Sequence, residues 1–184
     1  YGNDAPDIYL IHGDLTDSEM NSLYNHPKIK AMVSFTKGEG FGRPLLEFST
    51  TGKPVIASNW SGHVDFLNKD YCTLLPGQLT DVHPSAVNSF IIKGTKWFTV
   101  DYNYASRVIN DVIQNYKQYL SKSRKQTQYV KDNFSLKAMS KIFCKLIDDG
   151  LSAVPQQVGL KLPKLKKKTD TAPITLKLPK LKKG

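Results

Sequence analysis

The sequence has only two cysteines, Cys72 and Cys144, among its 184 residues. Two thiols are too few for the disulfide framework of a small secreted domain or for a four-cysteine zinc site. We expect both to lie buried as small apolar side chains in a reducing compartment. The four histidines are scattered without the spacing of metal ligands, so we expect neither a metal nor another cofactor.

The sequence also lacks a long apolar run and a leader. No stretch approaches the roughly 18 apolar residues of a membrane span. The first residues lack the basic start and apolar middle of a signal peptide. We therefore expect a cytoplasmic protein that is at most peripheral to a membrane. The chain does not begin with Met, which suggests a fragment or a processed product.

Basic residues exceed acidic ones by 26 to 16, a net charge of +10, but the excess is uneven. Residues 151–184, here called the basic tail, contain nine lysines and a single acid, so they carry +8 of that total. Residues 1–150 carry only +2 and have the composition of a globular domain. The sequence thus predicts one domain at 1–150 and an appendage at 151–184.

The basic tail contains an internal repeat. Residues 160–167 read LKLPKLKK, and the same eight residues recur at 176–183. The central proline disfavours a helix, and three leucines per copy cannot offset the entropy of ordering so many lysines, so we expect disorder. Residues 160–183 could be a solubilising extension, could attract an anionic membrane surface, or could dock a protein partner twice. Nucleic acid is disfavoured, because the tail has no aromatic residue and no arginine.

In the first 150 residues, short β-rich runs alternate with helical patterns, which predicts an α/β domain with a Rossmann-like parallel sheet. Strands are predicted at residues 8–11, 31–35, 54–58 and 71–75. Thr16 and Glu19 form a capping box that opens one helix, and Pro44 begins another. Residues 78–100 show no clear period, and the chain after residue 100 is helical.

The segment with the most chemical information is residues 39–47, which read EGFGRPLLE. It predicts a strand, a glycine turn and a helix start, whose unpaired N–H groups and positive dipole end favour an anion. Gly40 and Gly42 would allow a ligand to approach the backbone closely. In an open parallel sheet the ligand cleft lies at the carboxyl ends of the strands, where this turn falls. A glycine turn before a helix is also a common capping loop, so the pattern alone leaves a purely structural role open.

The nine residues resemble the E-x7-E signature of retaining GT-B glycosyltransferases. Residues 52–59 look like that family's strand after the motif helix, and residues 61–67 are similar to its following loop. Trp97 and the helices from Asp101 onward resemble its closing helices. The resemblance covers residues 8–150 and implies the C-terminal, nucleotide-sugar-binding half of a GT-B fold. It implies transfer of a hexose from a nucleoside diphosphate sugar to an unknown acceptor, with retention of configuration.

The resemblance also implies roles for individual residues. Glu39 would contact hydroxyls of the donor sugar at the catalytic centre. Glu47 would bind the vicinal ribose hydroxyls of the nucleotide, since a carboxylate accepts such bonds strongly. The other donor-binding candidates are Lys37, Gly40, Phe41, Gly42, Arg43, Leu45 and Leu46. Further candidates are Asp14 and Leu15 at the nucleobase and His63 near the site.

In that family the departing diphosphate is stabilised electrostatically by the helix dipole, amides and basic side chains, and usually no metal is needed. The acceptor-binding half and the first donor-domain strands, with their phosphate-binding basic residues, would lie upstream of Tyr1. Lys37 and Arg43 could partly substitute, or could be ordinary solvated cations. We expect donor-site architecture without full independent catalysis. The alternative is a non-catalytic module tethered by its basic tail. Trp60 is a candidate for the sugar pocket, with a place in the core as its alternative.

Overall fold

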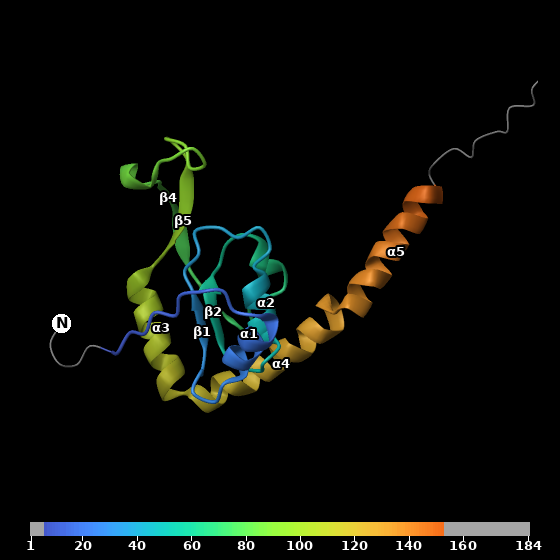
Figure 1. The fold of residues 1–184 in the computed structure, drawn as a ribbon, viewed down its shortest axis with the longest axis horizontal. Helices are drawn as coiled ribbons and strands as arrows, with labels where there is room; N and C mark the ends of the chain where they lie inside the picture. The colour runs from blue at the N-terminus through green and yellow to red at the C-terminus, as the bar shows by residue number, and fades with distance from the viewer. Residues whose placement is uncertain (1–5, 153–184) are drawn as a thin grey trace, which may run out of the picture. The chain divides into compact units, whose positions relative to one another are not determined.

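The computed structural model describes residues 6–152 of the chain (Figure 1). Its contacts divide the chain into two units, Tyr1–Leu146 and Ile147–Gly184. The domain described below belongs to the first unit, except that the last residues of its final helix, from Ile147 onward, belong to the second. The basic tail was predicted to be disordered. Its residues from 153 onward lie outside the described part of the chain, so this stays a prediction.

The centre of the domain is a parallel sheet in the order β1-β2-β3, which confirms the predicted α/β class. Its strands are β1 (Met32–Ser34), β2 (Val55–Ser58) and β3 (Thr73–Leu75). All four residues of β2 are buried, as expected for the middle strand of a parallel sheet that is covered on both faces. Three of the four predicted strands are therefore present, each shorter than predicted.

The alternation of side chains along β2 builds two cores, one on each face of the sheet. Val55 and Ala57 pack with residues of α2 (Arg43–Ser49), on the side where α1 (Asp17–Asn25) also lies. Ile56 packs on the other face with residues of α3 (Tyr102–Gln114). The sheet is thus the middle of three layers, the arrangement of a Rossmann-like domain.

Two of the helices, α1 and α3, begin with a side-chain cap. Thr16 caps α1 in a complete capping box, because its side chain accepts from the Glu19 N–H while Glu19 accepts from the Thr16 N–H. Asp101 caps α3 by accepting from the Tyr104 N–H at 2.9 Å. Two more helices follow, α4 (Tyr116–Phe134) and α5 (Leu136–Ser152).

Residues 8–11, predicted as a strand, form none in the structure. Ile8, Tyr9 and Leu10 are each more than four-fifths exposed. The apolar run fits a strand locally, but a strand forms only where a neighbouring strand satisfies its backbone groups. Within the described residues no strand pairs with this segment.

The segment without a clear period, 78–100, belongs largely to an antiparallel hairpin. Its strands are β4 (Gly77–Asp81) and β5 (Lys96–Val100), with the short helix η2 (Pro84–Ala86) in the connection. The Phe98 N–H donates to the Lys37 carbonyl oxygen at 3.2 Å, so β5 is tied to the turn before α2. The hairpin thereby contributes side chains to the edge of the sheet where the motif lies.

The two cysteines differ in burial. Cys72 lies in the core, as predicted, and Cys144 is exposed on α5, so that part of the prediction was wrong. The large apolar residues of α5 are exposed as well, so the helical periodicity of this segment does not correspond to burial. None of the helices in the described part of the chain is long and apolar enough to span a membrane.

Candidate functional site

The turn at residues 37–42 runs from the carboxyl end of β1 to α2 and is fastened to the loop that follows β2. The Glu39 N–H donates to Ser61 Oγ at 3.0 Å, and the Ser61 hydroxyl donates to the Glu39 carbonyl oxygen at 2.5 Å. The Gly62 N–H donates to the same oxygen at 3.0 Å. These three bonds hold the backbone of Glu39 in one place at the carboxyl edge of the sheet.

Glycine is required where the two loops meet. A Cβ on Gly62 would lie 2.1 Å from the carbonyl oxygen of Gly40, a distance that no side chain can occupy. Gly42 has φ +86°, and a Cβ there would lie 2.9 Å from the Cβ of His63. Of the two glycines predicted to let a ligand approach, Gly42 lets the two loops pack against each other, whereas a Cβ on Gly40 would meet nothing within 4 Å; Gly62 was not predicted.

Ser61 has an unusual backbone conformation, with φ 77° and ψ −165°. This region is populated almost only by glycine and costs a residue with a side chain on the order of 1–3 kcal/mol. The hydrogen bonds to Glu39 hold Ser61 there. Strain of this kind gathers at binding and catalytic sites, which draws attention to the loop after β2.

His63 is completely buried beneath the motif turn. Its Nε2 lies 2.6 Å from the Ser58 carbonyl oxygen, which can only accept, so Nε2 carries the proton. Its Nδ1 has no hydrogen-bond partner among the described residues. The structure therefore gives His63 a supporting position under Gly42, and its predicted contact with a ligand stays a prediction.

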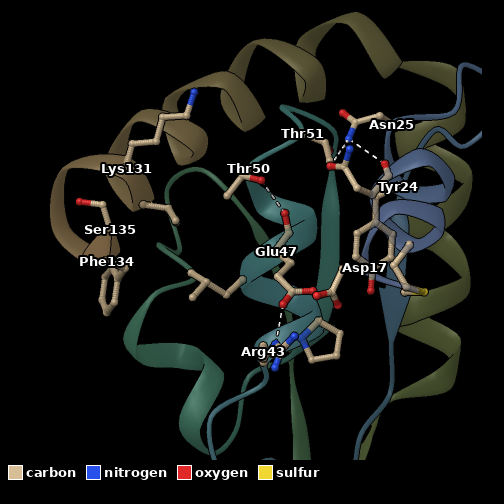
Figure 2. A pocket seen from close by; sticks show the side chains of 15 residues that line it. Asp17, Tyr24, Asn25, Arg43, Glu47, Thr50, Thr51, Lys131, Phe134 and Ser135 are labelled. Carbon is tan, nitrogen blue, oxygen red and sulfur yellow. Dashed lines mark hydrogen bonds and ion pairs between the residues drawn. The ribbon is translucent and has the colours of Figure 1, made fainter. Parts of the chain in front are cut away.

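A cavity of about 680 Å³ lies between α1, α2 and the end of α4 (Figure 2). In Figure 2, Tyr24 of α1 and Lys131 of α4 lie on opposite sides of it, with Glu47 of α2 between them. The volume falls within the range of small-molecule sites, about 300–1,000 Å³. Glu47 and Arg43 line this cavity, whereas Glu39 is not among its lining residues.

Arg43 and Glu47 form an ion pair one turn apart on α2. Arg43 Nε donates to Glu47 Oε1 at 2.6 Å, and both side chains are solvent-accessible. That hydrogen bond, with the charges of Glu47 and Asp17, raises the pKa of Arg43. Burial, and secondarily the charge of Glu47, raises the pKa of Tyr24. One carboxylate oxygen of Glu47 is therefore engaged, and a ligand diol would share Glu47 with Arg43.

Asp17 and Tyr24 belong to this cavity, and sequence reasoning did not find them as site residues. The capping box did predict the helix that carries them, but nothing in a single sequence tells which helix face meets α2. Asp14 and Leu15 are exposed and come just before that helix. They lie close in sequence to Asp17, and their role at a nucleobase stays a prediction.

The amides of Leu45 and Leu46 are already engaged. Both donate to the Gly42 carbonyl oxygen, at 3.0 and 3.1 Å, in the first turn of α2. The Leu45 side chain is buried in the core, whereas Phe41 is about half exposed with its ring 5.1 Å from that of Phe66. If the amides of Leu45 and Leu46 bind the diphosphate, each N–H must be shared between the diphosphate and the Gly42 carbonyl oxygen.

Lys37 is held by β5 and α3 and is not a freely solvated cation. Its Nζ donates to Thr99 Oγ1 at 3.1 Å and to the Tyr102 hydroxyl at 3.4 Å. The same Nζ lies 5.2 Å from the centre of the Trp97 ring, within range of a cation–π interaction. These partners were missed because they lie in or next to the segment without a readable period.

No protein-family model matches the chain, and no curated protein matches it either. Among residues 6–152, no group of three or more histidine, cysteine, aspartate or glutamate side chains could hold a metal ion. The family expected from residues 39–47 therefore stays a prediction, and the chemistry of the site is argued from its residues.

Proposed function

We propose that this chain is the donor-binding part of a retaining GT-B glycosyltransferase, which transfers a hexose from a nucleoside diphosphate sugar to an acceptor. One observation carries the proposal. Of the two glutamates of the nine-residue segment, Glu39 lies on a turn fixed at the carboxyl edge of a parallel sheet, and Glu47 lies on the wall of a ligand-sized cavity. Ligands of open α/β sheets bind at this edge.

The proposed roles are those that the resemblance to the family implies, and the charges of the side chains suit them. The Glu47 carboxylate accepts from the vicinal hydroxyls of the ribose, and the neighbouring Arg43 brings positive charge toward the diphosphate. Glu39 accepts from hydroxyls of the hexose. The bond between the anomeric carbon and the diphosphate oxygen breaks, the acceptor oxygen bonds to the same face of that carbon, and the acceptor proton passes to the diphosphate. Positive charge near the leaving group lowers the barrier to this step.

The proposal is tested by incubating the full chain with a panel of nucleoside diphosphate hexoses and measuring release of the nucleoside diphosphate. We expect slow release from at least one donor, reduced about tenfold or more in Glu39→Gln. Asp70→Asn, which neutralises an exposed acid elsewhere on the surface, serves as the matched control. An absence of release together with an absence of donor binding by calorimetry would overturn the enzyme proposal.

A second candidate function, a binding module tethered to an anionic membrane surface, is favoured by α5. Its apolar side chains form one exposed helical stripe, and the basic tail with its +8 charge follows in the sequence. The residues of the stripe are Leu136, Met139, Ile142, Phe143, Leu146, Ile147 and Leu151. An apolar helix face together with lysines is the combination that holds a protein at an anionic lipid surface. Deletion of residues 155–184 separates the two functions, because nucleotide binding should survive it.

A further inference from the structure

The indole of Trp60 lies parallel to a buried ring. Trp60 follows β2 directly after Asn59, and its ring stacks on that of Phe98 with planes 2° apart and centres 5.6 Å apart. Phe98 is only 6% exposed, whereas Trp60 is 41% exposed. Because Phe98 covers one face of the indole, solvent reaches Trp60 on the remainder of its surface.

The backbone on both sides of Trp60 is fixed. The Asn59 N–H donates to the Leu75 carbonyl oxygen at 2.9 Å, which continues the pairing with β3. On the other side, Ser61 is held in its strained conformation by its two hydrogen bonds to Glu39. These bonds place the backbone of Trp60 at the carboxyl edge of the sheet, and the stack on Phe98 orients its indole. A half-exposed aromatic side chain next to a strained residue is a candidate for contact with a ligand.

The ring beneath Trp60 is tied to the same turn as Glu39. The Phe98 N–H donates to the Lys37 carbonyl oxygen at 3.2 Å, two residues before Glu39. Three segments of the chain, namely the turn before α2, the loop after β2 and β5, thus fix the indole and the Glu39 backbone relative to each other. None of the residues that form these bonds lines the cavity beside Glu47.

We propose that Trp60 is a stacking platform for the hexose ring. The apolar C–H face of a pyranose would lie on the indole, while the Glu39 carboxylate accepts hydrogen bonds from its hydroxyls. This inference rests on the proposed function, in which a hexose is the group transferred. A nucleobase also stacks on tryptophan but offers few donors to a carboxylate, whereas a hexose offers several hydroxyls.

The test measures binding of methyl hexopyranosides to the full chain by saturation-transfer NMR and by tryptophan fluorescence. Saturation-transfer NMR measures all variants, and fluorescence serves only where Trp60 is present, in the background variant Trp97→Phe, which removes the other tryptophan. We expect saturable binding that weakens about tenfold in Trp60→Ala and less than threefold in Trp60→Phe, which keeps an aromatic face. Phe90→Ala, which removes an aromatic residue that is 93% exposed, should leave the affinity unchanged.

The outcomes separate this inference from the proposed function. Two results overturn the platform: equal hexoside affinity of Trp60→Ala and wild type, or no hexoside binding by any variant. In either case, binding of nucleoside diphosphates would leave the proposed function standing. Loss of nucleoside diphosphate affinity in Trp60→Ala, without hexoside binding, would assign the indole to the base and also overturn the platform. Urea unfolding of each variant verifies the fold, and Trp60→Phe keeps the test decisive if Trp60→Ala does not fold.

Discussion

At the scale of single residues, the candidate site depends on how closely two loops can approach. Ser61 and Gly62 bond to the backbone of Glu39, and the approach leaves no room for a Cβ at Gly62. A glutamate in a solvated turn would sample many positions, whereas this one has its backbone fixed before any ligand arrives. Such preorganisation reduces the cost of binding and of charge stabilisation.

Replacing Gly62 by alanine should break this junction. The added Cβ would lie 2.1 Å from the Gly40 carbonyl oxygen, so one loop must move and the hydrogen bonds to Glu39 are lost. We expect the free energy of unfolding, measured by urea denaturation, to fall by about 2 kcal/mol or more. Gly38→Ala is the matched control, since its nearest neighbour would be 4.0 Å away. Equal stability of the two variants would contradict the described packing.

The two thiols should react very differently. Burial raises the pKa of Cys72 to about 12, so in the folded protein it stays a thiol, whereas Cys144 is exposed. At pH 8 we expect a thiol reagent to modify Cys144 at once and Cys72 only after unfolding in urea. Cys144→Ser should remove the fast phase. Rapid modification of both thiols in the folded protein would show that the core around Cys72 opens readily.

The same burial gives a pH dependence of stability. The folded pKa of Cys72 lies above the unfolded value of about 8.5, so the stabilisation is complete below pH 8.5 and is lost as the pH rises toward about 12. Between pH 8 and 10, the urea midpoint of Cys72→Ala should therefore fall less than that of the wild type. Parallel declines of variant and wild type would contradict the assignment.

At the scale of elements, a side chain of α4 holds the segment that directly follows the short helix containing His63. Gln126 is 1% exposed, and its side-chain amide donates to the Phe66 carbonyl oxygen at 2.6 Å while its oxygen accepts from the Asn68 N–H at 3.2 Å. One side chain thus satisfies two backbone groups of the segment after η1 (Gly62–Asp65). The clamp holds that segment against the helical layer of the domain.

Removing the clamp should be costly. In Gln126→Ala the Phe66 carbonyl and the Asn68 N–H lose their partner, and we expect the free energy of unfolding to fall by about 3 kcal/mol. Lys125→Ala, which shortens an exposed side chain of the same helix, should change it by less than about 0.5 kcal/mol. Urea denaturation measures both variants. A small effect of Gln126→Ala would mean that water replaces the amide and that α4 does not fix the segment.

The elements also show what a sequence reveals. The strand at Val55–Ser58 was predictable because it is an apolar run between Pro54 and a loop, and α1 because its capping box is local. The hairpin of β4 and β5 was not, since Leu79 and its neighbours are largely exposed and give no period. Residues 8–11 fitted a strand locally, but pairing depends on a distant neighbour.

The candidate site was predictable to a similar degree. The nine-residue segment located the turn and α2 correctly, whereas the close approach of the two loops at Gly62 was not predicted. The ion pair of Arg43 with Glu47 follows from their i, i+4 spacing, although it was not predicted. The contacts of Lys37 with Thr99 and of Ser61 with Glu39 join residues far apart in the chain, which no single sequence specifies.

At the scale of the whole molecule, most of the net charge lies in a different part of the sequence from the candidate site. The first 150 residues carry +2 and contain the candidate site, while the basic tail carries +8. The net charge of +10 therefore says little about the substrate. We propose instead that this charge acts with the exposed apolar side chains of α5 to hold the chain at an anionic surface.

Membrane association can be measured by sedimentation with vesicles. We expect the full chain to sediment with phosphatidylserine-containing vesicles and far less with neutral phosphatidylcholine vesicles, with binding that falls as salt rises. Deleting residues 155–184 should abolish most of it, and Phe143→Glu on the α5 stripe should weaken it further. Equal sedimentation with both kinds of vesicle, or none, would contradict tethering by charge.

The central claim, that residues 39–47 and the adjoining cavity bind a nucleoside diphosphate sugar, is tested most directly by isothermal titration calorimetry. The titrants are nucleoside diphosphates and their hexose derivatives, added to the full chain and to Glu47→Ala. Glu47 lies on the cavity wall and is solvent-accessible, so the variant should fold normally and bind at least about tenfold more weakly. Binding of none of these compounds, or equal affinity of variant and wild type, would contradict the account.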